Sequence, residues 1–522
     1  MTTPRNATLA TLGVAVIAAA ALATGSLLID PAPTTVGGTA QSAHPSQVEL
    51  ACPAGLVDPF DTSNVARAAT WSSLSASPIT PAPDSITGTG GTIPTGLTLV
   101  GQGGGELAGL SAVGCAAPRT SQWIAAGATT SGADMVLILS NPSPTASVVS
   151  IDGYGAYGPL NASPRQVTVA ANSAVSVLLA GWFPDENSLA IHIQADGGGI
   201  AAWAQASLMD GEIPQGATLA SAVVPSTTQT ILGVDPKGTS LLRLVSPSGD
   251  AHVNVSVADS AGVHPLGGGE ATVAEGSTLE MPLDGATKDA SLIALIVTSD
   301  REVVAQTTTI TLGSPWVERA NAWIMRSNAV PATTLTQAAI PGRSSLEAMA
   351  TQQLSAAPIR RTALETESGV NGTRARLLLY APLSPDDEAV AQAGDDAAQS
   401  AAPAPTATPN IWASPSPSAT TSGEVGDAQS TGTSPSTPGA IAVNVAGSTV
   451  YVAPGVPTLV ELPEAAGQLS AASPIQAAVV ISADTPVGRM TTTWNVGTEG
   501  ISAVNGLSLI HISEPTRLGM IS

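Results

Sequence analysis

Few residues in this chain have the types and spacing that catalysis or metal binding requires. The histidines that merit attention are His44, His192, His252 and His264, and none has the Cys or His neighbour that a zinc site needs at short spacing. No serine stands in a G-x-S-x-G turn, the usual frame of an acyl-transfer nucleophile. We therefore predict no catalytic residue, no metal ligand and no cofactor, and we expect that the protein is not an enzyme.

Acidic residues offer two further patterns to weigh. Asp386–Glu388 and Asp395–Asp396 are adjacent acids in a stretch with almost nothing to bury, where no apolar surroundings would raise a carboxyl pKa for acid catalysis. Asp196, Asp300 and Asp484 each follow an apolar run. Because each stands without a second acid at ligand spacing, we interpret them as turn formers rather than metal ligands.

The two cysteines, Cys52 and Cys115, predict one disulfide bond. An even cysteine count is typical of disulfides in exported chains. The bond would close a loop of about 64 residues and stabilise the fold by roughly 4 kcal/mol in the loop-entropy model.

Tryptophans are the strongest candidates for a binding surface in a chain with only 3% aromatic residues. Exposed Trp side chains stack on sugars or anchor protein partners. We predict that Trp203 and Trp494 fill the core, and that Trp182 and Trp316 contact a partner protein or a glycan.

Composition excludes some classes of partner. The 522 residues carry 17 Lys and Arg against 39 Asp and Glu, a net charge of -22. Nucleic acids and anionic membrane surfaces both require clustered basic residues, so we expect neither as a partner.

The N-terminal segment predicts export. Residues 6–29 carry no charge, and Arg5 precedes them. Twenty-four residues would form a helix of roughly 36 Å, enough to cross a bilayer core of about 30 Å. We expect a single-pass anchor at the cell membrane with the bulk of the chain outside the cytoplasm; the alternative is a signal peptide cleaved after Ala21-Leu22-Ala23, which would make the protein secreted.

Internal similarity is the strongest signal in the rest of the chain. Three segments begin with related strands, MVLILSNPS, SLLRLVSPS and RLLLYAPLS, and continue with a second strand and a predicted hairpin. The hairpins read VTVAANSAVSV, ATVAEGSTLEM and VYVAPGVPTLVEL, and they place Asn172, Gly276 and Gly455 at a turn that needs positive φ. Val169 and Val273 lie 104 residues apart, as do Asp196 and Asp300.

These patterns predict an all-β protein of tandem immunoglobulin-like β-sandwich repeats after the N-terminal helix, with a β-propeller as the alternative. Ser344 to Glu347 resembles a capping box and predicts one short helix. The expected organisation is a membrane anchor or signal peptide at 1–30, a disulfide-tied β region at 31–130, repeats at 131–235, 236–342 and 343–506, and a disordered insertion at 384–438.

The last residues do not read as native sequence. Leu507 to Arg517, LSLIHISEPTR, matches the in-frame translation of a transposase-type sequencing adapter. We interpret residues 507–522 as a product of sequence assembly, and exclude them, with His511, from structural reasoning.

Trp123 opens the stretch WIAAGATTSG, which leads into the LILSNPS strand. With the N-terminal apolar segment and the early cysteine pair, this stretch resembles an actinobacterial envelope family catalogued as domain of unknown function 5719. The resemblance implies a membrane-anchored, exported protein without an established activity. We expect a non-enzymatic scaffold or interaction module for other envelope proteins, and alternatively a cell-wall glycan-binding protein.

Overall fold

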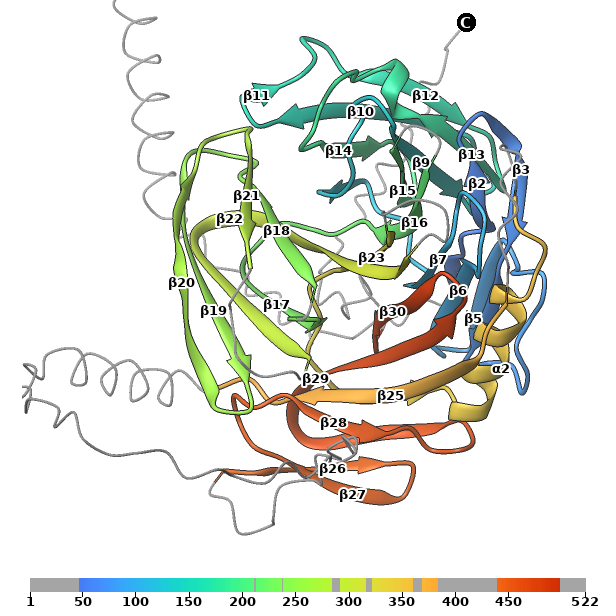
Figure 1. Cartoon of the computed structure of the whole chain (residues 1–522), viewed down its shortest axis with the longest axis vertical. Coiled ribbons are helices and arrows are strands. Elements are labelled where there is room, and N and C mark those ends of the chain that lie inside the picture. Colours follow the sequence, from blue (N-terminus) through green and yellow to red (C-terminus); the bar gives the residue numbers. More distant parts are fainter. Residues whose placement is uncertain are drawn as a thin grey trace, which may run out of the picture. The chain divides into compact units, whose positions relative to one another are not determined.

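Antiparallel β-strands form nearly all the regular structure of the computed structural model, as predicted (Figure 1). It describes residues 47–210, 213–236, 238–283, 292–315, 322–359, 369–383 and 439–497. The predicted anchor at 1–30, the insertion at 384–438 and the terminal residues 507–522 lie outside this part of the chain. Within it, no helix combines the length and apolar character that a membrane crossing requires.

The second module shows the repeating unit most clearly. One of its sheets has the order β12-β10-β14-β8, with the two-residue β11 also paired to β10, and the other has the order β13-β9-β15-β16. The elements of this module are β8 (Ser121–Ile124), β9 (Ala133–Asn141), β10 (Ser147–Gly155), β11 (Gly158–Pro159), β12 (Arg165–Val169), β13 (Ser173–Leu178), the 3₁₀ turn η1 (Leu179–Gly181), β14 (Ala190–Ala195), β15 (Ala201–Asp210) and β16 (Ile213–Ser221).

A single core lies between the two sheets of this module. Leu137 and Leu139 on β9 and Ile191 and Ile193 on β14 are fully buried in it. Residues along β10 alternate between buried and more exposed, the pattern of a strand with one face in a core. The β-propeller alternative is therefore wrong, because a blade is a single sheet, whereas each repeat here folds two facing sheets around one core.

The third and fourth modules repeat the same pairing. In each, one long strand, β22 or β29, runs through both sheets and takes the places of β14 and β15. The third module has β17 (Ser226–Val234), β18 (Thr239–Val245), β19 (Ala251–Asp259), β20 (Gly262–Val273), β21 (Thr278–Pro282), β22 (Ile293–Pro315) and β23 (Ala322–Ala329). The fourth has β24 (Leu335–Ile340), α2 (Arg343–Leu354), β25 (Gly372–Tyr380), β26 (Ile441–Val445), β27 (Ser448–Val452), β28 (Thr458–Glu461), β29 (Gly467–Thr485) and β30 (Gly488–Asn495).

The predicted hairpins are wrong. β12 pairs with β10, whereas β13 pairs with β9 in the other sheet, so the chain crosses between sheets at this point. Asn172, Gly276 and Gly455 nevertheless adopt the predicted positive φ, at 49°, 64° and 75°. A left-handed residue reverses the chain equally well within a sheet and between two sheets, so the turn chemistry did not distinguish these outcomes.

The region before the three predicted repeats is a fourth, smaller copy. Its pairs β1–β5, β4–β6 and β6–β7 correspond to β8–β14, β9–β15 and β15–β16 of the second module. An additional hairpin, β2–β3, occurs only here among the described modules. The strands of this first module are β1 (Gln47–Ala51), β2 (Gly55–Asp58), β3 (Asp61–Arg67), β4 (Ala69–Ser72), β5 (Ser85–Thr89), β6 (Gly96–Gln102) and β7 (Gly109–Gly114).

The last strand of each module meets the last strands of its two neighbours. β7 contacts β16, β16 contacts β23, β23 contacts β30, and β30 returns to β7, near the centre of Figure 1. The approach is close at Gly109, where an added Cβ would lie 2.1 Å from the carbonyl oxygen of Ala217. The four modules therefore form a closed ring, which we call the central ring of β7, β16, β23 and β30.

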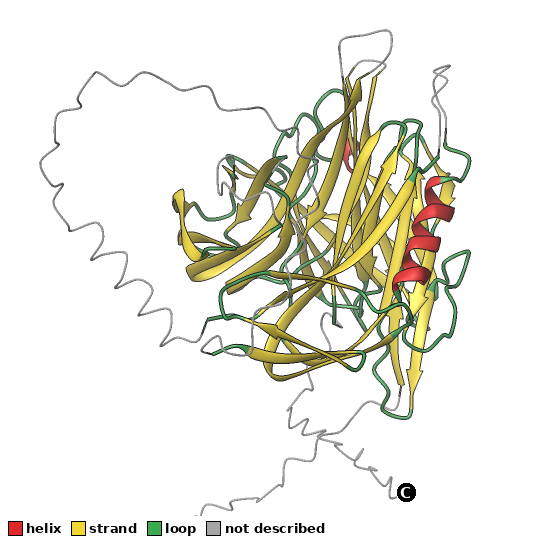
Figure 2. Cartoon of the chain, turned by 60° about the horizontal axis from the view of Figure 1, so that its bottom comes forward, coloured by secondary structure: helices red, strands yellow, loops and turns green. Residues whose placement is uncertain are grey.

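The helix α2 covers the junction between the first and fourth modules. Its Leu346, Met349 and Leu354 are buried together with strand residues of both modules, and Figure 2 shows it lying along the outside of the strands. The predicted helix is confirmed, but the capping box is wrong. Gly342 is the N-cap, Ser344 Oγ donates to the carbonyl oxygen of Glu464, and Glu347 Oε1 accepts from the N–H of Ala375.

Candidate functional site

A cleft of about 630 Å³ lies between the first and second modules. One wall comes from the β2–β3 hairpin and the end of β1, and the opposite wall comes from β13 and the end of β9. Segments around residues 50–65 and 138–176 therefore build one site from distant parts of the sequence. We call this hollow the β13 cleft.

The wall formed by the first module ends in a tight turn that the sequence encodes locally. The Asp58 side chain accepts a hydrogen bond of 3.0 Å from the N–H of Phe60, and the Asp61 side chain accepts from both the N–H and the Oγ of Ser63. Asp is favoured in such turns because its carboxylate can accept from the backbone two residues on. The turn holds Phe60 at the tip of the hairpin, where 72% of its surface is exposed.

The floor of the β13 cleft is apolar. Trp203 on β15 and Ile138 on β9 line it, and Trp203 has no exposed surface in the folded chain. The Trp203 indole Nε1 donates to the carbonyl oxygen of Gly114 at 3.3 Å. This bond ties the second module to the last strand of the first and fixes the ring that forms the floor.

The wall formed by the second module depends on Asn141, which ends β9 and is fully buried. Its Nδ2 donates to the carbonyl oxygens of Thr145, Val169 and Ala170, and its Oδ1 accepts from the N–H of Ser143. A buried amide with every group bonded rigidifies the loop around it. Asn141 therefore holds the turn that leads into β13, and so positions the open edge of the cleft.

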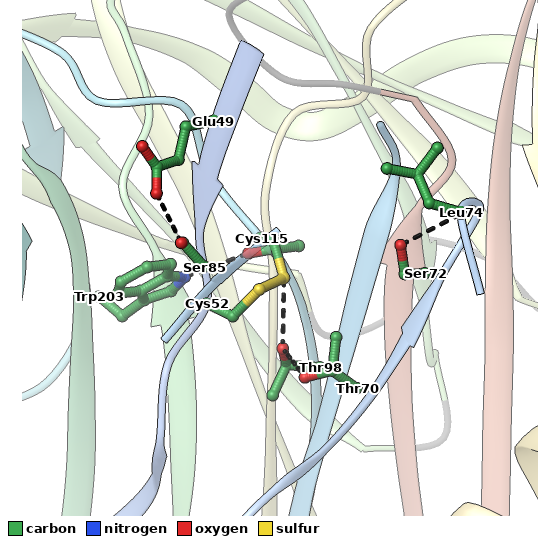
Figure 3. The surroundings of a disulfide bond; sticks show 10 residues. Glu49, Cys52, Thr70, Ser72, Leu74, Ser85, Thr98, Cys115 and Trp203 are labelled. Carbon is green, nitrogen blue, oxygen red and sulfur yellow. Dashed lines mark hydrogen bonds between the residues drawn. A yellow bond between two sulfur atoms is a disulfide. The ribbon is translucent and has the colours of Figure 1, made fainter. Parts of the chain in front are cut away.

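The cleft has a negative rim. Glu49 and Asp84 line it, and among the described lining residues none is Lys or Arg. Ser85 donates its Oγ proton to Glu49 Oε1 at 2.6 Å, which orients that carboxylate (Figure 3).

The predicted disulfide between Cys52 and Cys115 is confirmed, with their Cα atoms 4.3 Å apart. Cys52 lines the cleft, and Figure 3 places Glu49 and Ser85 to one side of the bond and Thr70 and Thr98 to the other. The bond stands beside the reciprocal backbone hydrogen bonds of Ala51 and Ala116, at 2.9 and 2.8 Å.

The second and third modules make the same join without sulfur. Trp123 and Val223 exchange backbone hydrogen bonds of 2.8 and 2.7 Å, and Ile231 forms a bridge with Pro331. The disulfide thus covalently reinforces a join that is common to the repeat.

The predicted tryptophan sites have different outcomes. Trp203 and Trp494 are buried, as predicted. Trp182 is half-buried directly after η1, four residues beyond the end of β13, and packs against the core of the second module. Trp316 lies outside the described residues.

A second group of polar residues lies on the outer face of the sheet that contains β14. His192 Nε2 and Ser121 Oγ are 2.9 Å apart, and the His192 ring stacks on Trp123 with centroids 4.4 Å apart. Asp152 lies opposite His192 in the sheet register and accepts a 3.1 Å hydrogen bond from Asn161. Burial lowers the pKa of His192, and the nearby Asp152 partly opposes that shift.

Sequence reasoning placed His192 in a strand but could not pair it with Ser121, 71 residues away. The stack on buried Trp123 makes this group part of the packing between modules. No cluster of three or more His, Cys, Asp or Glu suited to a metal ion occurs in the described part of the chain.

Asp196 lies in the turn after β14, as predicted, whereas the turn role predicted for Asp300 is wrong because Asp300 lies within β22. Asp196 Oδ1 accepts from the N–H of Val148, and Asp300 Oδ1 accepts from the N–H of His252, both at 2.8 Å. The expectation for Asp484 is wrong, because it lies within β29 opposite Gly372, at the far end of the other sheet. β29 is one long strand with two similar apolar runs, and the comparison of the repeats aligned the wrong run with those that precede Asp196 and Asp300.

Comparison with known proteins identifies a family but no characterised relative. Residues 84–378 match the family described as Family of unknown function (DUF5719), which covers more than half of the chain. No curated protein and no solved structure matches the chain. The match includes the second and third modules and the cleft wall that contains β13, whereas residues 49–65 of the opposite wall precede it. Because the match covers more than half of its length, the chain belongs to the DUF5719 family.

Proposed function

We propose that this chain is a non-enzymatic, membrane-anchored protein outside the cytoplasm, whose ring of β modules binds another protein of the cell envelope. The β13 cleft carries the proposal. It combines a lining that includes Ile138 and Trp203, a polar rim, and Phe60 exposed at the tip of the hairpin that forms one wall. Buried aromatic floors with polar rims are typical of surfaces that bind proteins.

The disulfide supports the proposed compartment. Structural disulfides persist in oxidising surroundings outside the cytoplasm, and are rare within it. The uncharged residues 6–29 supply a segment of the right length for a membrane anchor, and the secreted form is the alternative.

The modules support a finer assignment of the fold. Two facing antiparallel sheets of about four strands each, built around one core, are the architecture of immunoglobulin-like sandwiches. We assign the second, third and fourth modules to that class on the basis of their shared strand pairing.

Glycan binding is the second candidate function. Its support is the half-buried Trp182, whose partly exposed ring could stack on a sugar. The β13 cleft favours a protein partner over a glycan, because the cleft is larger than the surface offered by the single Trp182 ring and is formed by two modules.

Site-specific photo-cross-linking in intact cells tests the proposed function. A photoreactive amino acid replaces Phe60, at the tip of the hairpin that forms one cleft wall, in one strain and Glu270, exposed on β20, in a control strain. We expect a covalent adduct with one envelope protein from the Phe60 position, and no such adduct from the Glu270 position. The proposal would be refuted if no protein adduct formed at Phe60. It would also be refuted if protease-accessibility measurements placed the protein inside the cytoplasm.

A further inference from the structure

We propose that the β13 cleft binds an extended, basic segment of a partner protein, which adds as a strand to the open edge of β13. This inference rests on the proposed function and names the chemistry of its partner. Its three supports are a free strand edge, an apolar floor and a negative rim.

The strand edge is the first support. β13 pairs with β9 along residues 173–178, and among the described strands no other pairs with it. An edge strand presents N–H and C=O groups that can pair with an incoming extended chain. Edge strands of soluble proteins are often protected by charged residues, whereas β13 reads SAVSVL and carries none.

The floor is the second support. On the face of the β13 sheet toward the cleft, Ala174 and Ser176 lie on the edge strand, next to Ile138 and Trp203, which line the cleft but are buried in the folded chain. Successive side chains of an added strand would point alternately toward this floor and toward solvent. The partner segment therefore needs apolar residues at every second position. At about 3.3 Å per residue, the six residues of β13 accommodate a segment of roughly six residues, or about 20 Å.

The rim is the third support. Glu49 and Asp84 border the cleft, and Glu49 is held by its hydrogen bond from Ser85. A Lys or Arg on the partner would meet these carboxylates, while an acidic segment would be repelled. The net charge of -22 over the whole chain acts in the same direction at longer range.

Peptide binding to the full-length protein tests this inference. The probe is a fluorescein-labelled ten-residue peptide of alternating Lys and Val, compared with an equally long peptide of alternating Glu and Val. Fluorescence anisotropy measures the dissociation constant. We expect binding of the Lys–Val peptide at least about tenfold tighter than that of the Glu–Val peptide.

Two neutralised variants separate the local from the long-range attraction. Glu49→Gln with Asp84→Asn removes the charges at the rim, and Glu270→Gln with Glu275→Gln removes two exposed charges on the third module. Both variants change the net charge equally. We expect the rim variant to weaken binding of the Lys–Val peptide about fivefold or more and the control variant less than about twofold.

Hydrogen exchange supplies the structural readout. Addition of the Lys–Val peptide should slow amide exchange in residues 173–178, because an added strand accepts hydrogen bonds from the open edge. The inference is refuted by absent binding, by equal losses in the two variants, or by unchanged exchange in this segment. A protein adduct at Phe60 without peptide binding would overturn this inference alone, whereas no adduct would overturn the proposed function.

Discussion

Trp71 and Trp494 meet edge to face with ring centroids 6.2 Å apart, and this contact joins the first module to the last. Both rings are buried in a core that also contains the inner face of α2. Beside them, Thr492 Oγ1 accepts a 2.9 Å hydrogen bond from the N–H of Ala112. The two ends of the described fold therefore close on each other through side chains that lie more than 400 residues apart.

Truncation of Trp494 should destabilise the whole fold. Trp494→Ala removes a buried aromatic side chain and leaves a cavity, so we expect the free energy of unfolding to fall by about 3–5 kcal/mol. Trp494→Phe keeps most of the volume and should cost less. Urea denaturation followed by circular dichroism measures both, and equal losses in the two variants would contradict the packing role.

The disulfide should contribute measurably to stability. Replacement of both Cys52 and Cys115 by Ala should lower the free energy of unfolding by about 2–5 kcal/mol, because the unfolded chain gains the entropy of an open loop. Reduction of the natural protein should give a similar loss, while a reducing agent should leave the double variant unchanged. A double variant as stable as the natural protein would show that the backbone join at Ala51 and Ala116 suffices.

Arg243 should be the costliest charged residue to remove. Its guanidinium pairs with Glu280 at 2.6 Å and donates to the carbonyl oxygens of Gly127 and Leu189, which links the second and third modules. Burial lowers the pKa of Arg243, and Glu280 opposes that shift. Arg243→Met would leave Glu280 and the two carbonyl oxygens without their hydrogen-bond donor. We expect the free energy of unfolding to fall by about 3 kcal/mol. This value is at the lower end for buried pairs because Glu280 is 27% exposed.

A second substitution identifies the origin of that loss. Addition of Glu280→Leu to Arg243→Met should restore part of the stability, since it removes the carboxylate left without its cation. Thermal or urea unfolding of the single and double variants measures the difference. A double variant that is less stable than Arg243→Met would contradict the ion-pair explanation.

Stability should depend on pH through His192. Because burial lowers the pKa of His192, the unfolded chain binds more protons than the folded chain between that lowered value and the ordinary value of about 6.5. Stability should therefore rise with pH across this window and be fully present above it. His192→Gln should flatten this part of the profile, measured as the free energy of unfolding between about pH 4 and about pH 8. A profile identical to that of the natural protein would contradict the prediction.

Strand positions, core tryptophans and the disulfide could all be predicted from local patterns. Alternation marked β10 and β19, and the scarcity of aromatic residues drew attention to Trp203 and Trp494. Each of these inferences needed only short-range periodicity or residue chemistry, which a single sequence carries.

The first module escaped detection as a copy of the repeat for a physical reason. It retains the pairs β1–β5, β4–β6 and β6–β7 but lacks counterparts of β10, β12 and β13, and it gains the β2–β3 hairpin. Strand pairing conserves backbone geometry rather than residue types, so the Gly- and Thr-rich segments of this module kept the arrangement without a recognisable sequence signature.

The β13 cleft was beyond prediction because neither wall is a site by itself. Thr62 and Glu49 come from the first module, while Ser176 comes from the second. Only the packing of the two modules brings these segments together, and local periodicity contains no information on that packing.

The closed circuit of β7, β16, β23 and β30 has a consequence for how the molecule comes apart. Repeats stacked in a line can fray from an exposed end, since the final member has a neighbour on one side only. Here each module has a neighbour on both sides, so the unfolding of any one module removes contacts from two others. Such an arrangement favours abrupt, all-or-none loss of structure over gradual peeling.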